Sequence, residues 1–315
     1  MKKTIFTLAA IVTIGTATTA LATPEKTISG KEGHQLAENF QQLTRSNVWE
    51  QTEKIDLQFN TFHPQGMTKV GDLYFMSSVE IIEKPAKYDQ PKEGFDRTPG
   101  KGIGHLFVFN EEGKLLKDLK LGEGDMYHPG GIAYDGTSIW IPVAEYRPNS
   151  SSIIYKVNPG TMESQEVFRT NDHVGGILRD ANEGKLKAVS WGSRTFYEFN
   201  DKGKILGKST NPSQFVDYQD CENAGKEKMI CSGITELPQP GNSAAKYELG
   251  GLALLDMKTM DMVYELPVSL FSPQGHVVTR NPVYLENTKQ GIKMYAIPDD
   301  DQSSMLVFET NISRK

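Results

Sequence analysis

Apolar residues follow two different periods along the chain. Between residues 31 and 45, Leu36, Phe40 and Leu43 recur at spacings of four and three, which is typical of an amphipathic helix. From Lys54 onward, short runs of β-branched and aromatic residues are broken by Gly, Asn, Asp and Pro, which indicates strands joined by turns. The pattern therefore predicts an all-β chain preceded by one short helix.

The strand pattern repeats. Residues 62–77, 127–143 and 172–190 each begin with a polar motif containing a histidine, continue into a strand, turn, and enter a second strand. Two weaker copies occupy residues 218–232 and 281–295, and further strands follow each copy. Repeated units of about four short strands are the signature of a β-propeller.

The repeat count predicts a five-bladed propeller. A six-bladed ring is the alternative, with a divergent unit between His63 and His128. The last unit has three strands, and residues 54–59 form a lone strand at the start, so we expect these two to pair and close the ring. We expect a signal peptide at 1–22, an N-terminal arm with the helix at 23–53, and the propeller at 54–315.

The N-terminus resembles a secretory signal. Lys2 and Lys3 precede an uncharged apolar stretch, and Ala20-Leu21-Ala22 matches a small-residue cleavage site. We therefore expect a periplasmic or secreted protein, cleaved near Ala22 and without a membrane span.

Export changes the interpretation of the two cysteines. Cys221 and Cys231 flank a polar turn, so two antiparallel strands would place them opposite each other. In an oxidising compartment this arrangement predicts a structural disulfide.

Charge excludes one class of partner. The chain has 34 Lys and Arg against 40 Asp and Glu, and the basic residues are not clustered. Nucleic-acid binding needs clustered cations to neutralise phosphates, so we expect no nucleic-acid partner. We expect a monomer whose partner is a small polar or anionic molecule.

One blade resembles known families. Residues 128–136, His-Pro-Gly-Gly-Ile-Ala-Tyr-Asp-Gly, followed by Ile-Trp-Ile-Pro-Val at 139–143, are similar to blades of NHL-type and gluconolactonase-like propellers. The whole chain also resembles secreted bacterial propellers of unassigned function. This resemblance implies the propeller fold and no particular activity.

The histidines of the repeat are the first candidate site. His63, His128 and His173 begin inner strands, with Gln219 or Asp220 and Asn281 in the weaker copies, so they should meet at one channel mouth. Three imidazoles suit zinc, iron or copper, a layout similar to that of propeller lyases. Without a metal, His128 and His173 would act as acid and base, with Glu145 as a further catalytic group. The structural alternative is that each histidine bonds the backbone of the next blade.

Other polar residues are expected on the same face and are assigned to ligand binding. Arg147 and Arg194 occupy equivalent places after second strands, and paired guanidinium groups suit a carboxylate or phosphate, unless each pairs with an acid such as Glu145. The remaining candidates are Glu80, Glu236, His276 and Asn281. Long loops at 81–102 and 237–248 should cover this face, where Tyr88, Phe95 and Tyr247 would line a pocket or pack the loops onto the ring.

Two functional classes remain. One is an exported enzyme, a metal-assisted hydrolase or lyase acting on a small polar or anionic molecule. The other is a non-catalytic propeller that binds a ligand or a protein. The convergence of ionisable groups at one mouth favours a small-molecule site over a flat protein surface, and we favour the enzyme.

Overall fold

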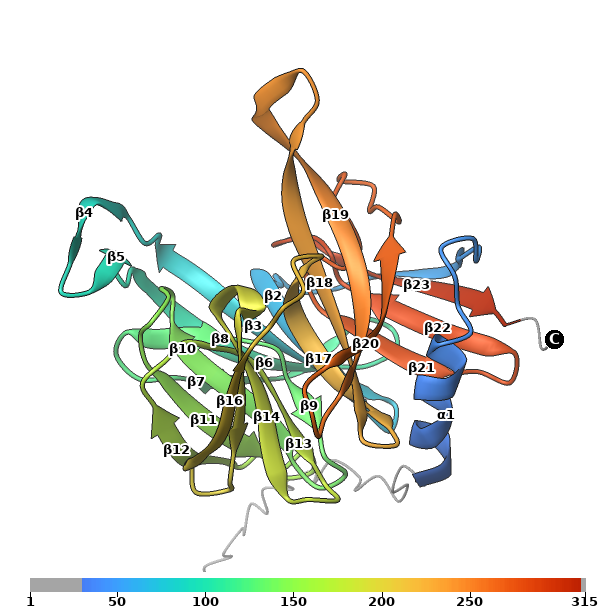
Figure 1. The fold of residues 1–315 in the computed structure, drawn as a ribbon, viewed down its shortest axis with the longest axis horizontal. Helices are drawn as coiled ribbons and strands as arrows, with labels where there is room; N and C mark the ends of the chain where they lie inside the picture. The colour runs from blue at the N-terminus through green and yellow to red at the C-terminus, as the bar shows by residue number, and fades with distance from the viewer. Residues whose placement is uncertain (1–29, 313–315) are drawn as a thin grey trace, which may run out of the picture.

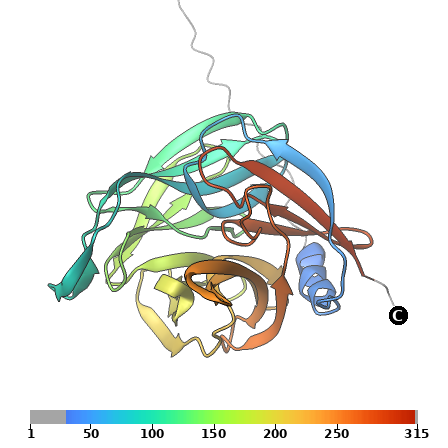
Figure 2. The same cartoon turned by 90° about the horizontal axis from the view of Figure 1, so that it is seen from above.

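The computed structural model describes residues 30–312, with the side chains of residues 30–34, 243 and 244 outside the description. The expected signal peptide therefore lies outside the described residues. Helix α1 (Gly30–Phe40) is followed by strands that form five antiparallel blades around a central axis (Figures 1 and 2). The prediction of five blades, rather than six, is confirmed. No helix within residues 30–312 is long and apolar enough to cross a membrane.

Four blades are each formed by one continuous stretch of the chain. The first contains β2 (His63–Val70), β3 (Leu73–Glu83), β6 (Lys101–Phe109) and β7 (Leu115–Leu121). The second contains β8 (Met126–Pro129), β9 (Ala133–Tyr134), β10 (Ile139–Glu145), β11 (Ser152–Val157) and β12 (Ser164–Thr170). The third contains β13 (Val174–Asp180), β14 (Lys185–Ser190), β15 (Thr195–Phe199) and β16 (Ile205–Thr210). The fourth contains β17 (Asp217–Gly225), β18 (Lys228–Gln239), β19 (Asn242–Asp256) and β20 (Met262–Val268).

The fifth blade joins the two ends of the chain. It contains β21 (Val283–Asn287), β22 (Gly291–Ala296) and β23 (Ser304–Asn311), and its outer strand is β1 (Glu50–Asp56). Strand β1 pairs antiparallel with β23, so the predicted closure of the ring is confirmed, with the strand beginning earlier than the expected residue 54. Leu36 and Phe40 of α1 are buried in the same apolar cluster as Leu252 and Leu285, which fixes the helix against the fourth and fifth blades.

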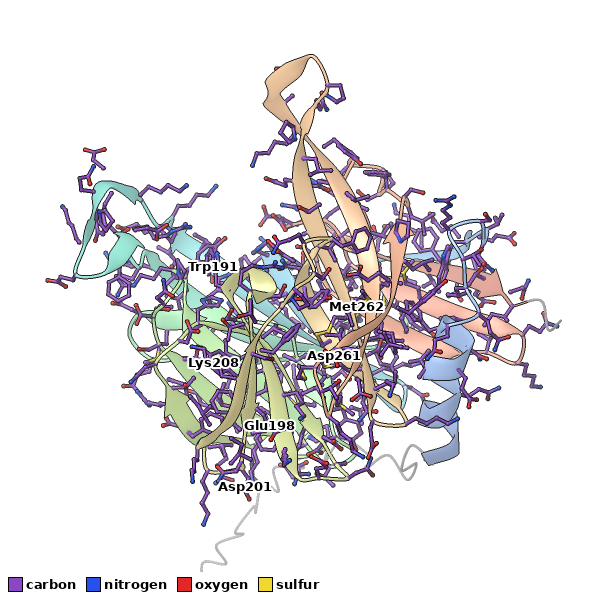
Figure 3. The ribbon with its side chains drawn as sticks, viewed as in Figure 1. Trp191, Glu198, Asp201, Lys208, Asp261 and Met262 are labelled. Atoms are coloured by element: carbon purple, nitrogen blue, oxygen red, sulfur yellow. A yellow bond between two sulfur atoms is a disulfide. The ribbon has the colours of Figure 1, made fainter. Side chains whose placement is uncertain are left out.

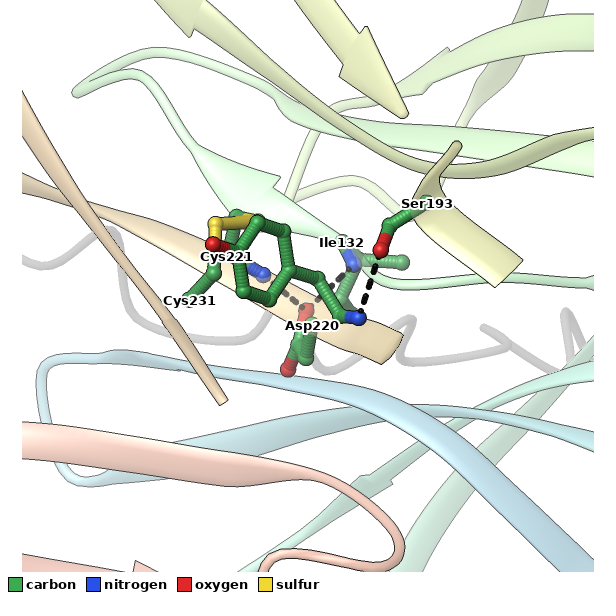
Figure 4. The surroundings of a disulfide bond; sticks show 6 residues. Ile132, Ser193, Asp220, Cys221 and Cys231 are labelled. Carbon is green, nitrogen blue, oxygen red and sulfur yellow. Dashed lines mark hydrogen bonds between the residues drawn. A yellow bond between two sulfur atoms is a disulfide. The ribbon is translucent and has the colours of Figure 1, made fainter. Parts of the chain in front are cut away.

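The inner strands touch one another and close the channel. The amide of Gly131 donates to the carbonyl oxygen of Gly175 at 2.8 Å, and a Cβ atom added to Gly66 would lie 2.5 Å from the backbone nitrogen of Ile132. The buried carboxylate of Asp220 accepts hydrogen bonds from the amides of Met67 and Ile132, at 2.8 and 2.9 Å, and so connects three blades; the bond to Ile132 is drawn in Figure 4. Glycine is required at position 66 because a side chain there would clash with the backbone of the neighbouring blade.

Two hairpins project from one end of the ring. Strands β18 and β19 extend together well beyond their blade, and strands β4 (Lys87–Lys92) and β5 (Phe95–Arg97) form an insertion between β3 and β6 (Figure 1). These correspond to the long loops expected at 237–248 and 81–102. The predicted disulfide is confirmed: Cys221 and Cys231 are opposite each other on β17 and β18 and are covalently joined (Figure 4).

Candidate functional site

Three histidines from consecutive blades form a row at the channel mouth. The ring centroids of His63 and His128 are 6.4 Å apart, and those of His128 and His173 are 5.9 Å apart. Each histidine stands at the beginning of an inner strand, directly before or within β2, β8 and β13. The repeat therefore places one imidazole from each of these three blades at the channel mouth.

The three imidazoles have different surroundings. His63 Nδ1 lies 2.9 Å from Asp300 Oδ1, and His173 Nδ1 donates to the carbonyl oxygen of Glu145 at 2.7 Å. Neither ring nitrogen of the buried His128 has a hydrogen-bond partner within the described residues. Burial lowers the pKa of His173 to about 4 and lowers that of His128 well below its usual value, so both are neutral at pH 7.

Two aromatic side chains cover this row. Tyr146 stacks on His128 with the centroids 4.1 Å apart, and Trp191 meets the ring of His173 edge-on at 4.7 Å. Trp191 begins the short 3-10 turn η1 (Trp191–Ser193) after β14, at the end of the ring with the hairpins (Figure 3). Sequence analysis missed Tyr146. Its signal was its place between Glu145 and Arg147, at the end of a second strand.

A cavity of about 580 Å³ opens beside the histidine row. His63 is the histidine that lines it, because His128 and His173 are buried beneath the aromatic rings. Its walls combine polar and apolar surface in similar amounts and carry charges of both signs. The lining residues are Asn60, Phe62, His63, Val79, Glu80, Ile81, Lys84, Pro85, Arg97, Tyr146, Arg280, Asp300 and Asp301.

Asp300 is the most connected carboxylate of the cavity. Besides His63, it accepts a hydrogen bond from Asn281 Nδ2 at 3.0 Å, and Arg280 Nη2 lies 3.3 Å from its Oδ2. Burial raises the pKa of Asp300, but the hydrogen bond with His63, the charge of Arg280 and the hydrogen bond from Asn281 outweigh burial and lower it to about 2. Asp300 is therefore ionised at neutral pH and fixes the orientation of the His63 ring.

The β4–β5 hairpin contributes the cationic side chain of Arg97 to the wall of the cavity. The Arg97 guanidinium lies 5.1 Å from the centroid of the Trp191 ring, and Asp96 pairs with it through two hydrogen bonds of 2.9 and 2.8 Å. Phe95 lies under the guanidinium of Arg147, 3.5 Å from ring centroid to Cζ. These contacts hold the hairpin against the second and third blades. Of the aromatics expected near the pocket, Phe95 packs on the ring of blades and does not line the cavity.

The remaining predicted ligand residues are engaged with protein groups. Arg147 Nε donates to Glu145 at 2.6 Å, which is the alternative pairing foreseen from the sequence, and Arg194 Nη2 lies 3.0 Å from Asp217. Neither arginine lines the cavity.

The other candidates divide in the same way. Glu236 pairs with Lys246 on the exposed β18–β19 hairpin, and His276 Nδ1 lies 3.0 Å from Glu248. Glu80 lines the cavity, whereas Asn281 contributes indirectly through Asp300.

In the fourth blade, the residue at the position of the histidines differs from the expected one. Gln219 or Asp220 was expected at the position of the histidines, but the ladder places Asp217 there. Asp217 lies opposite Ile234 just before the bulge at Gln219, as His63 lies opposite Val79 before the bulge at Gln65. The β-bulge at Gln219 was not recognised from the sequence, and without it the fourth copy of the motif is aligned wrongly with the other copies.

The sequence also predicted a metal site at the three histidines. Within residues 30–312, the structure contains no group of three or more His, Cys, Asp and Glu side chains arranged to hold a metal ion. The zinc, iron or copper site at His63, His128 and His173 stays a prediction.

Comparisons with known proteins identify a family. A model described as a family of unknown function, DUF6454, matches residues 28–314. The curated proteins contain no match to the sequence.

The chain is also similar to solved structures at low sequence identity. A hypothetical protein from Leishmania major is 10% identical, with a TM-score of 0.46 over 87% of this chain and 94% of that one. The tail fiber of Staphylococcus aureus phage P68 is 8% identical, with a TM-score of 0.45 over 88% of this chain and 56% of that one. The NHL-type and gluconolactonase-like resemblance of residues 128–143 stays a prediction.

Proposed function

The chain belongs to DUF6454, a family of unknown function, and we propose that it binds a small anionic molecule in the cavity at the channel mouth. The observation that carries this proposal is the set of cationic side chains on the cavity wall. Lys84 and Arg97 come from the insertion between β3 and β6, Arg280 comes from the segment before β21, and all three line one space of about 580 Å³.

The availability of these cations supports an anionic ligand. Lys84 has no ion-pair partner within the described residues, whereas Arg97 and Arg280 line the cavity while paired with Asp96 and with Asp300 and Glu248. Guanidinium groups bind carboxylates and phosphates through paired hydrogen bonds. The acids Asp300 and Glu80 on the same wall would accept hydrogen bonds from ligand hydroxyl groups, which favours a hydroxylated or otherwise polar anion.

The shape of the site favours a small ligand over a protein partner. Ligand sites are concave and contain a few convergent polar groups, and this cavity has a volume within the usual range. A non-catalytic propeller that binds a protein would use a flatter surface. Export to the periplasm or outside the cell is part of the proposal, and the Cys221–Cys231 disulfide supports it.

Isothermal titration with inorganic phosphate and with citrate tests the proposal. We expect one site per chain, with affinity at least tenfold weaker in Arg97→Gln and in Arg280→Gln. Arg169→Gln is the matched control, because Arg169 pairs with Glu123 and Glu166 on the surface and does not line the cavity. Failure of both anions to bind the wild type, or equal affinity in all four proteins, would contradict the proposal.

A further inference from the structure

We infer that His63 is a general base, oriented by Asp300, for hydrolysis of a small carboxylic ester bound in the cavity. The inference rests on the proposed function, because the anionic group of the ester would bind Lys84, Arg97 or Arg280. It adds a reaction and a catalytic residue to the binding site.

The position of His63 distinguishes it from the other histidines. Its side chain is 24% exposed and lines the cavity, whereas His128 and His173 are buried under Tyr146 and Trp191. With Nδ1 at Asp300, the opposite nitrogen, Nε2, has no protein partner within residues 30–312. A neutral imidazole held in this way keeps a proton on Nδ1 and a lone pair on Nε2, which is the form that accepts a proton.

A chain of charged groups holds Asp300 in place. Asn281 donates to the same oxygen as His63, and Arg280 contacts the other oxygen. Arg280 Nε in turn lies 3.7 Å from Glu248, which also binds His276. Asp300 is thus a positioning residue, fixed from the fifth blade and from the base of the β18–β19 hairpin.

The cavity also contains a group suited to the developing negative charge. Tyr146 lines the same cavity as His63, and burial raises the pKa of its hydroxyl, so the hydroxyl is protonated at neutral pH and can act as a donor. Donors placed at the oxyanion stabilise the tetrahedral intermediate of acyl transfer.

The reaction is balanced with water as the nucleophile. His63 Nε2 accepts a proton from water while the water oxygen forms a bond to the ester carbonyl carbon, and Tyr146 donates to the resulting oxyanion. The bond from this carbon to the alcohol oxygen then breaks. The imidazolium returns the proton to that oxygen, giving a carboxylic acid and an alcohol without a redox partner.

Ester hydrolysis by the full mature chain tests the inference. The probe is 4-acetoxybenzoate, an anionic ester, followed by release of 4-hydroxybenzoate, with neutral 4-nitrophenyl acetate for comparison. We expect kcat/KM for 4-acetoxybenzoate to fall at least 100-fold in His63→Gln and in His63→Asn, since positioned bases contribute roughly 10²- to 10⁴-fold. Asp300→Asn should lower kcat about tenfold and leave KM unchanged.

His105→Gln is the matched control. His105 also pairs with an aspartate, its Nδ1 lying 2.8 Å from Asp118, and it is not itself a lining residue, although it contacts Phe62 and Glu80, which line the cavity. We expect it to keep wild-type activity. Absence of wild-type hydrolysis, or full activity in both His63 variants, would overturn the inference.

Phosphate titration separates this result from failure of the binding site. If His63→Asn binds phosphate as the wild type does and the wild type hydrolyses no ester, the base is wrong and the anion site stands. If the wild type binds neither phosphate nor citrate, the proposed function itself fails. Circular dichroism of each variant confirms that the fold is retained.

Discussion

Histidine and glycine have separate tasks in the short motif that opens three of the inner strands. The histidines stand at the channel mouth, while the glycines two or three positions later lie where the inner strands touch. A Cβ atom on Gly131 would lie 2.6 Å from the carbonyl oxygen of Gln219 and 2.8 Å from Asp220 Cα. The motif therefore combines a rim side chain with a closed channel beneath it.

The first prediction concerns this close approach. Gly131→Ala should destabilise the protein by about 1–3 kcal/mol, because the new methyl group meets backbone atoms that cannot move independently. Gly207→Ala is the control, since its Cβ would meet the nearest atom, Glu198 Cβ, at an ordinary 3.6 Å. Urea unfolding of the three proteins checks the difference. Equal midpoints for Gly131→Ala and the wild type would contradict the role given to this glycine.

At the scale of elements, β1 is the strand that closes the ring. Most of its residues are exposed, and it pairs with β23, its neighbour in the fifth blade. Its contribution is therefore to cover the backbone groups along the edge of β23 rather than to fill the core. Unpaired strand edges promote association with other chains.

Truncation tests this assignment. A protein beginning at Gln58 lacks β1 and should self-associate and unfold at lower temperature, because the edge of β23 is unpaired. A protein beginning at Val48 lacks α1 but keeps β1, and it separates the effect of the strand from that of the helix. Light scattering after gel filtration, compared with the chain beginning at Thr23, gives the association state. If the Gln58 protein matches the Val48 protein in both properties, β1 is dispensable.

At the scale of the whole molecule, buried ionisable groups connect stability to pH. The folded-state pKa of His173 is about 4, and that of His128 is also depressed, against about 6.5 in an unfolded chain. Between these values the unfolded state binds more protons, so stability is complete above pH 6.5 and is lost as pH falls towards 4. Burial raises the pKa values of Asp220 and Glu222, and these groups act in the opposite direction.

A variant isolates the histidine contribution. From pH 7 to pH 5, His173 should cost the wild type about 2 kcal/mol of unfolding free energy, and this part should disappear in His173→Gln. Asp220 and Glu222 are present in both proteins, so their effect cancels in the comparison. Urea unfolding at the two pH values measures it. Identical pH dependence in the two proteins would show that His173 titrates normally in the folded state.

The architecture of this protein could be predicted from local patterns along the chain. Five copies of one pattern, the lone first strand and the spacing of Cys221 and Cys231 predicted the blades, the ring closure and the disulfide, because strand periodicity and repeats are local properties of the chain. The amphipathic spacing of Leu36 and Phe40 likewise predicted the helix.

The grouping of polar residues into one site depends on contacts made in the folded ring. Tyr146, Arg97 and Arg280 come together with His63 because of blade geometry and the folding back of the β4–β5 hairpin, neither of which has a local signal. Arg147 and Arg194 have the expected repeat positions, yet pairing with Glu145 and Asp217 uses their charges. Repeat position sets where a side chain lies on the ring, whereas its charge partner depends on which acids lie nearby, such as Glu145 two residues before Arg147 and Asp217 on the next blade beside Arg194.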